Sequence, residues 1–354
     1  MSEHLRFGVW APVYGTWASF HHPEEPVDAS WDRTSALIRD AERLGYETAL
    51  IAQHLINPFG EQHDQLETWT ATAALAALTE RIELIAAVKP YLHHPVVLAK
   101  QAAQIEEISR GRFGINLVNA WYKPELERAG IGFAEHDQRY AYGAEWLHVV
   151  RGLLAGQRVD FRGEHFRVED YRLRPTGTHR PRPAIYVGGE SEPARQLAAA
   201  QADTWFLNGQ PLDDVRALVD DGAARPRGGD PLRFALSAFA IARETDAEAQ
   251  EVLQHQWELA ERDKATWEGL VADADPKAVM FRTFARNPHI GTNGGTAAGL
   301  VGSYDTVAKR ILEFRELGIG TLMLQFQPFE AEQRRFAAEV IPRYRELAGE
   351  DVST

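Results

Sequence analysis

The sequence contains no cysteine. Without thiols the chain cannot form disulfide bonds, thiolate metal sites or cysteine nucleophiles. It also lacks a basic N-terminal segment followed by an apolar stretch, as a signal peptide would have. No apolar run reaches the roughly eighteen residues that a membrane helix needs. We therefore expect a cytoplasmic protein that does not enter a membrane.

Basic residues are fewer than acidic ones. The chain has 38 lysines and arginines against 51 aspartates and glutamates, a formal net charge of −13. Such a charge disfavours binding to nucleic acid or to an anionic membrane surface. An anionic ligand would have to be attracted locally, by helix N-termini and individually placed arginines.

Several common catalytic motifs are missing as well. There is no HExxH sequence and no cluster of His, Asp and Glu that predicts a metal site. His93 and His94 are adjacent, and neighbours in an extended segment point to opposite faces, so we do not expect a shared metal. The GxSxG elbow and the GxxxxGK[ST] phosphate loop are also absent. The reactivity is therefore expected from a bound organic cofactor rather than from a metal or a strong nucleophile.

What the sequence does contain is a regular alternation of short apolar runs and amphipathic segments. Eight such repeats predict a (β/α)8 TIM barrel, an α/β fold, while an open doubly wound sheet is the alternative. We expect one domain over residues 1–354. The predicted strands cover residues 6–12, 47–54, 82–90, 112–121, 184–190, 203–209, 233–242 and 320–326. The predicted helices cover 31–44, 66–78, 96–108, 140–154, 212–223 and 331–347, with two more beginning near 192 and 246.

Two segments interrupt this repeat. Within about 156–180, residues 159–168 alternate and contain Arg-Gly, which predicts an inserted β-hairpin. Residues 263–302, before the eighth strand, do not fit the period and contain the glycine-rich stretch 291–299. This second insertion is interpreted as a mobile lid near the catalytic face or as a disordered surface loop, and the sequence leaves both open.

In barrel enzymes the active site lies at the C-terminal ends of the strands. After the fifth predicted strand, Gly188 and Gly189 permit close backbone approach, and Ser191 stands at a helix N-terminus. This arrangement suits a phosphate monoester, although a tight turn with a capping serine explains it equally well. The other strand ends are rich in amides and aromatics: Trp10, Gln53, His54, Lys89, Asn116, Asn119, Trp121, Trp205 and Phe239.

Four stretches carry a family resemblance: GRFGINLVNAWYKPELERAGI, HDQRYAYGAEWL, PAIYVGGESEPARQLAAAQADTWFLNG and GLVGSYDTVAKRI. In order and spacing they resemble the bacterial luciferase-like family of flavin-dependent monooxygenases, over nearly the whole chain. The resemblance implies a single luciferase-like barrel that takes reduced FMN (FMNH2) from a separate NAD(P)H:flavin reductase. It also implies oxidation of a small organic substrate with O2, and a homodimer or homotetramer.

Within the family the chain is similar to the dimethylsulfone and alkanesulfonate monooxygenases and to the pyrimidine oxygenase. These imply cleavage of a C–S bond or of a ring amide. The sulfonate enzymes carry a cysteine near the end of the second strand and an Arg-x-His motif on the seventh, both absent here. Phe239 matches the dimethylsulfone type, whereas the NLVNAWYKPE and LVGSY stretches lean toward the pyrimidine oxygenase. The substrate stays open between these two.

Carried over by position, the resemblance assigns FMN contacts to Gln53, His54, Asn116, Glu125, Arg139, Tyr140 and Ser191, with Gly188 and Gly189 beside them. His54, Asn119 and Gln53 are the catalytic candidates, with His54 as a general acid or base or as a neutral hydrogen-bonding partner of the flavin. The substrate-binding candidates are Trp10, Trp121, Trp205, Phe239, Arg282 and Arg286.

Simpler explanations exist for some of these residues. Glu125 and Arg139 could form a structural ion pair, Tyr140 could be a packing aromatic, and the lid arginines could be solvated surface charges. For the whole chain, a deazaflavin-dependent oxidoreductase and a non-catalytic flavin-binding protein are the alternatives. A flavin as the substrate itself also stays open.

Overall fold

The computed structural model describes residues 4–350. Its centre is a closed barrel of eight parallel strands in the order β1-β12-β9-β8-β7-β4-β3-β2. Pairing of β1 with β12 closes the sheet. The predicted (β/α)8 barrel is thus confirmed, and the open sheet is excluded. The barrel strands are β1 Arg6–Trp10, β2 Thr48–Ile51, β3 Glu83–Val88, β4 Phe113–Leu117, β7 Ala184–Gly188, β8 Thr204–Leu207, β9 Arg233–Phe239 and β12 Ile319–Gln325.

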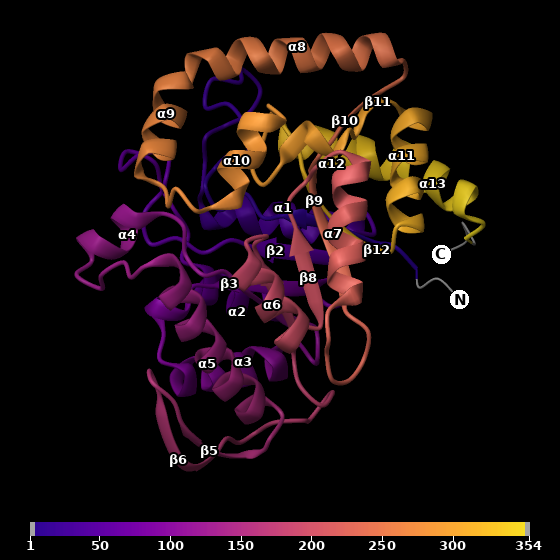
Figure 1. Cartoon of the computed structure of the whole chain (residues 1–354). Helices are drawn as coiled ribbons and strands as arrows, with labels where there is room; N and C mark the ends of the chain where they lie inside the picture. Colours follow the sequence, from indigo (N-terminus) through magenta and orange to yellow (C-terminus); the bar gives the residue numbers. More distant parts are fainter. Residues whose placement is uncertain (1–3, 351–354) are drawn as a thin grey trace.

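The strand interiors are almost fully buried because helices cover the outside of the barrel (Figure 1). The covering helices are α1 Trp31–Arg43, α2 Thr68–Leu78, α3 Pro95–Ile108, α5 His136–Leu154, α6 Glu192–Gln201, α7 Leu212–Ala224, α11 Tyr304–Glu316, α12 Phe329–Arg335 and α13 Ile341–Ala348. A π-helical turn, Phe336–Val340, joins the last two, and the short η1 Pro90–Leu92 and α4 Lys123–Arg128 follow β3 and β4. Across residues 4–350, no helix is long and apolar enough to cross a membrane.

The seventh barrel helix is not the one that the sequence pattern predicts. The helix that begins at Asp246 is α8 Asp246–Arg262, and it packs on β10 Ile241–Arg243 and β11 Val301–Ser303, a pair outside the barrel. The predicted strand 233–242 is accordingly split after Phe239. The helix that packs beside β12 is α11, to which the pattern assigned no helix. A capping box at Thr245 marks the N-terminus of α8 clearly in the sequence. The pairing of β10 with β11, which the local sequence does not show, places this helix outside the barrel.

The second insertion is mostly helical rather than irregular. Helix α8 runs into α9 Lys264–Asp273, followed by α10 Val279–Arg286 and the 3-10 turn η2 Gly295–Ala298. In Figure 1, α8 lies across the top of the molecule, and α9 and α10 descend from it on the left. Together these helices stand over the C-terminal ends of the barrel strands.

The glycine-rich stretch of this insertion is packed against the barrel. The Gly209 N–H donates to the carbonyl of Asn293 at 2.8 Å, and Gln325 and Thr292 exchange two hydrogen bonds of 3.0 Å. Gly294 has φ +87°, and a Cβ there would overlap the carbonyl oxygen of Gly209. The glycine is required for close backbone contact. This stretch is therefore not an open surface loop.

The predicted β-hairpin is present as β5 Arg158–Arg162 paired antiparallel with β6 Arg167–Arg172. It packs on α5 and lies at the lower end of the molecule in Figure 1, away from α8, α9 and α10. The hairpin is therefore remote from the elements that cover the strand ends.

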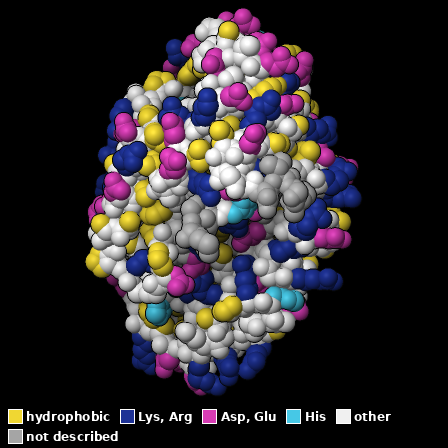
Figure 2. All heavy atoms as spheres, turned by 90° about the vertical axis from the view of Figure 1, so that its right-hand side faces the viewer, with side chains coloured by type: hydrophobic (Ala, Val, Ile, Leu, Met, Phe, Trp, Pro, Cys, Tyr) yellow, Lys and Arg dark blue, Asp and Glu magenta, His cyan; other side chains and the backbone are white. Residues whose placement is uncertain are grey.

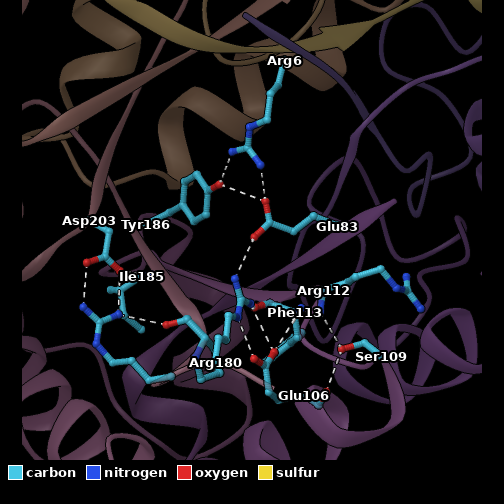
Figure 3. Close-up of polar contacts among 12 residues, drawn as sticks. Arg6, Glu83, Glu106, Ser109, Arg112, Phe113, Arg180, Ile185, Tyr186 and Asp203 are labelled. Carbon is cyan, nitrogen blue, oxygen red and sulfur yellow. Dashed lines mark hydrogen bonds and ion pairs between the residues drawn. The ribbon is translucent and has the colours of Figure 1, made fainter. Parts of the chain in front are cut away.

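A polar network closes the N-terminal end of the barrel (Figure 3). The Arg6 guanidinium donates to Glu83 at 2.7 Å, to the Tyr186 hydroxyl at 2.8 Å and to Thr321 at 3.2 Å, so one side chain connects β1, β3, β7 and β12. Burial and the Glu83 carboxylate raise the pKa of Tyr186 to about 12. Figure 2 looks onto this end, where acidic and basic side chains are interspersed around a hollow. This end stabilises the barrel, which leaves the opposite end for chemistry.

We expect Gly294→Ala to lower the free energy of unfolding by at least about 2 kcal/mol more than Gly132→Ala, measured by urea denaturation. Both glycines have nearly the same φ, +87° and +86°, but a Cβ at Gly132 would meet nothing within 4 Å. The control therefore isolates the clash with Gly209 from the strain of a left-handed conformation. Equal losses in the two variants would show that the close contact is unimportant.

Candidate active site

Two adjoining cavities open at the C-terminal ends of the barrel strands, with volumes of about 900 and about 770 Å³. We call the first the apolar chamber and the second the polar chamber. They are parts of one site, because the same six residues line both: Trp10, Asn116, Val118, Trp121, Met280 and Asn293.

The polar chamber is built around the turn that follows β7. Gly189 has φ +106°, and a Cβ there would lie 2.9 Å from the Tyr140 hydroxyl, so the turn needs glycine. The turn brings Ser191, the N-cap of α6, and the free backbone N–H groups behind it to the chamber wall. Gly188, Arg139 and Tyr140, to which the resemblance assigns the cofactor, and the catalytic candidate Asn119 also line this chamber.

Four buried polar atoms of this chamber have no hydrogen-bond partner within the described part of the chain: Trp10 Nε1, Asn116 Oδ1, Asn119 Nδ2 and Ser191 Oγ. More than nine in ten buried polar groups in proteins are hydrogen-bonded, so four orphans around one cavity indicate a polar ligand. They offer donors and an acceptor beside a helix N-terminus. Such a set fits the phosphate, ribityl chain and polar ring edge of FMN.

Arg139 is buried at the wall of the polar chamber, and its charge is already paired. Its guanidinium forms an ion pair with Asp275, donates to the Ala134 carbonyl at 2.6 Å and lies 4.0 Å from the ring centroid of Phe133. Glu125 is not its partner, so the ion pair between these two residues that the sequence left open does not form. Asp275 comes from the second insertion, where its backbone N–H donates to Trp121.

Glu125 instead belongs to a buried cluster with His54 and Lys89. His54 Nδ1 lies 3.0 Å from Glu125 Oε2 and 2.8 Å from Lys89 Nζ, and Lys89 and Glu125 form an ion pair. Burial alone would raise the pKa of Glu125, but His54 and Lys89 hold it at about 2. Burial, together with the Lys89 charge, lowers the pKa of His54 to about 4. His54 is therefore neutral near pH 7. The sequence located Lys89 at a strand end but gave it no role.

Gln53 has both ends of its side chain engaged. Its Oε1 accepts from the Lys89 backbone N–H at 2.7 Å, and its Nε2 lies 2.9 Å from His93 Nε2. Gln53 lines the apolar chamber, but these bonds make it a support for the segment around Lys89.

Aromatic side chains dominate the apolar chamber, and many come from the second insertion. The large ones are Trp10, Tyr14, Trp17, Phe59, Trp121, Trp267, Phe281 and Phe284. Trp10 and Trp121 of the predicted substrate-binding residues are thus among its walls. Met280, Phe281 and Phe284 follow a helical spacing in the sequence, a signal by which they could have been found. No group of three or more histidine, aspartate and glutamate side chains within residues 4–350 could hold a metal.

Four of the predicted substrate-binding residues lie outside the walls of both chambers. Trp205 is fully buried and donates to the Gly189 carbonyl at 2.8 Å, while its neighbour Phe206 faces the polar chamber. Phe239 is fully buried in the core behind Gly291. The lid arginines point away: Arg282 donates to the Lys277 carbonyl at 3.2 Å, and Arg286 pairs with Asp214 at 2.6 Å with 60% of its side chain exposed.

Comparison with known proteins gives the family. The model of the luciferase-like monooxygenases matches residues 13–321. An FMNH(2)-dependent dimethylsulfone monooxygenase of Pseudomonas putida is 30% identical over 99% of this chain and 98% of its own length.

Solved structures share the fold at lower identity. A long-chain alkane monooxygenase superposes with a TM-score of 0.79 at 19% identity, covering 100% of this chain and 94% of its own. An F420-dependent secondary alcohol dehydrogenase superposes with 0.70 at 17% identity, covering 97% and 100%. With the family model spanning most of its length and its two chambers at the strand ends, the chain belongs to the luciferase-like monooxygenases.

Proposed function

We propose that this protein is the oxygenase of a two-component system, which takes reduced FMN from a separate flavin reductase and uses O2 to oxidise a neutral, largely apolar small molecule. The observation that carries the proposal is the juxtaposition of four unpaired polar atoms in one chamber with an aromatic chamber beside it. The relative named as FMNH(2)-dependent supports the choice of cofactor.

The polar chamber would hold the cofactor. Ser191 and the N-terminus of α6 bind its phosphate, with Arg139 close by, and Asn116 and Asn119 bond polar atoms of its ribityl chain or ring edge. Bound reduced FMN supplies the two electrons with which O2 is activated. The protein's part would be to hold the cofactor through these residues and to exclude water from it.

The apolar chamber would hold the substrate. Its walls carry no unpaired charge, because Lys89 is neutralised by Glu125 and burial keeps His54 neutral. The lid arginines that could have clamped an anion point to solvent and to Asp214. A sulfonate would be left without a counter-ion here, so a neutral sulfone or ring amide is the better fit.

We expect Ser191→Ala to weaken reduced-FMN binding at least about tenfold while changing the free energy of unfolding by less than about 0.5 kcal/mol. Ser191 makes no capping hydrogen bond, so only the ligand loses a partner. The affinity is measured by anaerobic titration followed by tryptophan fluorescence, with oxidised FMN and reduced deazaflavin as comparators.

Ser303→Ala is the matched control. Ser303 caps α11 by accepting from the Thr306 N–H at 3.2 Å, far from both chambers, so its loss should cost about 1 kcal/mol of stability and no affinity. Unchanged reduced-FMN affinity in Ser191→Ala would remove the phosphate site from the polar chamber. Tighter binding of the deazaflavin would overturn the proposed cofactor.

The buried neutral His54 predicts a pH dependence. Its pKa is about 4 in the folded protein and about 6.5 when unfolded, so below pH 6.5 the unfolded chain binds the extra proton and stability falls. Between pH 7 and pH 4.5, we expect wild type to lose up to roughly 3 kcal/mol more than His54→Gln in chemical denaturation. Parallel losses would mean that His54 is not held neutral by burial.

Arg282→Ala and Arg286→Ala should leave KM and kcat for neutral substrates within about twofold of wild type, because neither side chain lines the apolar chamber. The assay couples the enzyme to a flavin reductase and offers dialkyl sulfones, cyclic amides and alkanesulfonates. A sulfonate preference that either substitution abolishes would contradict the assignment of a neutral substrate.

A further inference from the structure

His289 is a histidine of the second insertion to which the proposed function gives no role. It follows α10, is 7% exposed, and lines the apolar chamber opposite the barrel. Its Nδ1 lies 2.9 Å from the carbonyl oxygen of Asn287. A carbonyl oxygen only accepts, so this Nδ1 carries the proton. Burial lowers the pKa of His289 and keeps the ring neutral, which leaves a lone pair on Nε2.

His54 meets both members of the buried ion pair through Nδ1. The Lys89 ammonium group, which can only donate, lies 2.8 Å from His54 Nδ1, and the Glu125 carboxylate, which can only accept, lies 3.0 Å from the same atom. These two neighbours favour opposite tautomers of the ring. In either tautomer Nε2 is the nitrogen that neither of them contacts.

The two Nε2 atoms are the free ends of these rings. Within residues 4–350 neither has a hydrogen-bond partner, and both histidines line the apolar chamber. An unpaired buried acceptor or donor costs about 1–3 kcal/mol, so each is expected to be satisfied when a substrate excludes water. Among aromatic walls, the chamber thus offers the lone pair of His289 Nε2 from the insertion.

We propose that the substrate is a neutral, largely apolar molecule carrying a hydrogen-bond donor, and that His289 Nε2 receives this donor. This inference rests on the proposed function and narrows its substrate class to secondary amides, lactams and hydroxylated rings. A dialkyl sulfone has acceptors only and would leave His289 unpaired.

His289 is held in place by its surroundings. Its ring packs edge-to-face on Phe284, with centroids 4.9 Å apart, and a Cβ at Gly295 would lie 3.1 Å from its Cδ2 atom. The ring therefore has little room to turn, and the direction of the lone pair is fixed. A fixed acceptor discriminates against a ligand that lacks the matching donor more strongly than a mobile one does.

The test compares oxindole with 1-methyloxindole, which share the carbonyl acceptor and aromatic body but differ in the N–H donor. Binding to the full chain is measured by isothermal titration calorimetry, with and without FMN. We expect oxindole to bind at least about tenfold more tightly in wild type, and the two to bind within about twofold of each other in His289→Phe. His255→Phe, at an exposed histidine on α8, is the matched control and should keep the discrimination.

Equal affinities in wild type, or tighter binding of the methylated ligand, would overturn the proposal, as would full discrimination in His289→Phe. If that variant does not fold, long-range ¹H–¹⁵N NMR of histidine-labelled wild type gives the tautomer directly. A proton on Nδ1 of His289 supports the proposal and a proton on Nε2 overturns it. Loss of reduced-FMN binding with intact discrimination would refute the proposed function alone. Flavin binding without discrimination would refute only this inference.

Discussion

Closure of the sheet between β1 and β12 is the constraint on which the rest of this structure depends. Because all eight strands run in the same direction around one axis, their C-terminal ends meet at one end of the barrel. Trp10, Asn116 and Gly188 lie far apart in the sequence yet border the same cavity for this reason. The Arg6 network at the opposite end connects four strands there.

The buried Lys89–Glu125 pair shows how the site uses charge inside an apolar setting. Removing two charges from water is costly, and a buried ion pair is often no more stabilising than well-packed apolar side chains. Here both members of the pair contact His54 Nδ1, and the ring itself stays neutral through burial and the Lys89 charge. Arg139 and Asp275 repeat the pattern at the polar chamber, where an aspartate of the insertion neutralises an arginine of α5. In both places the site keeps hydrogen-bonding groups without keeping net charge.

The sequence predicts the barrel well because the hydrophobic periods of strands and helices are local features. Apolar runs alternating with amphipathic segments predicted the eight strands, and Gly188, Gly189 and Ser191 were correctly expected at a strand end. The prediction fails where the position of an element depends on contacts between residues that are distant in the chain. The capping box of α8 looks like any barrel helix start, and only the β10–β11 pairing moves that helix outside.

The same limit applies to side chains. Trp205 and Phe206 are neighbours on one strand, and strand alternation alone does not say which of the two faces the cavity. Arg139 finds its carboxylate 136 residues further on, at Asp275, and no spacing rule anticipates that partner. The helical spacing of Met280, Phe281 and Phe284, in contrast, is a local signal that the sequence does contain.

The two chambers differ in which parts of the chain form their walls. The polar chamber is lined mostly by strand ends, the turns that follow them and α5, and Asp275, Met280 and Asn293 of the insertion complete its wall. In the apolar chamber, Trp267, Phe281 and Phe284 belong to α9 and α10, which take no part in the barrel sheet. Hydrogen bonds hold the insertion to the barrel, among them those between Gly209 and Asn293 and between Gln325 and Thr292. Replacing the aromatic side chains of α9 and α10 would alter which molecules fit the apolar chamber while leaving the turn after β7 unchanged. Changes confined to these two helices could therefore adapt one barrel to new substrates, by selection or by engineering.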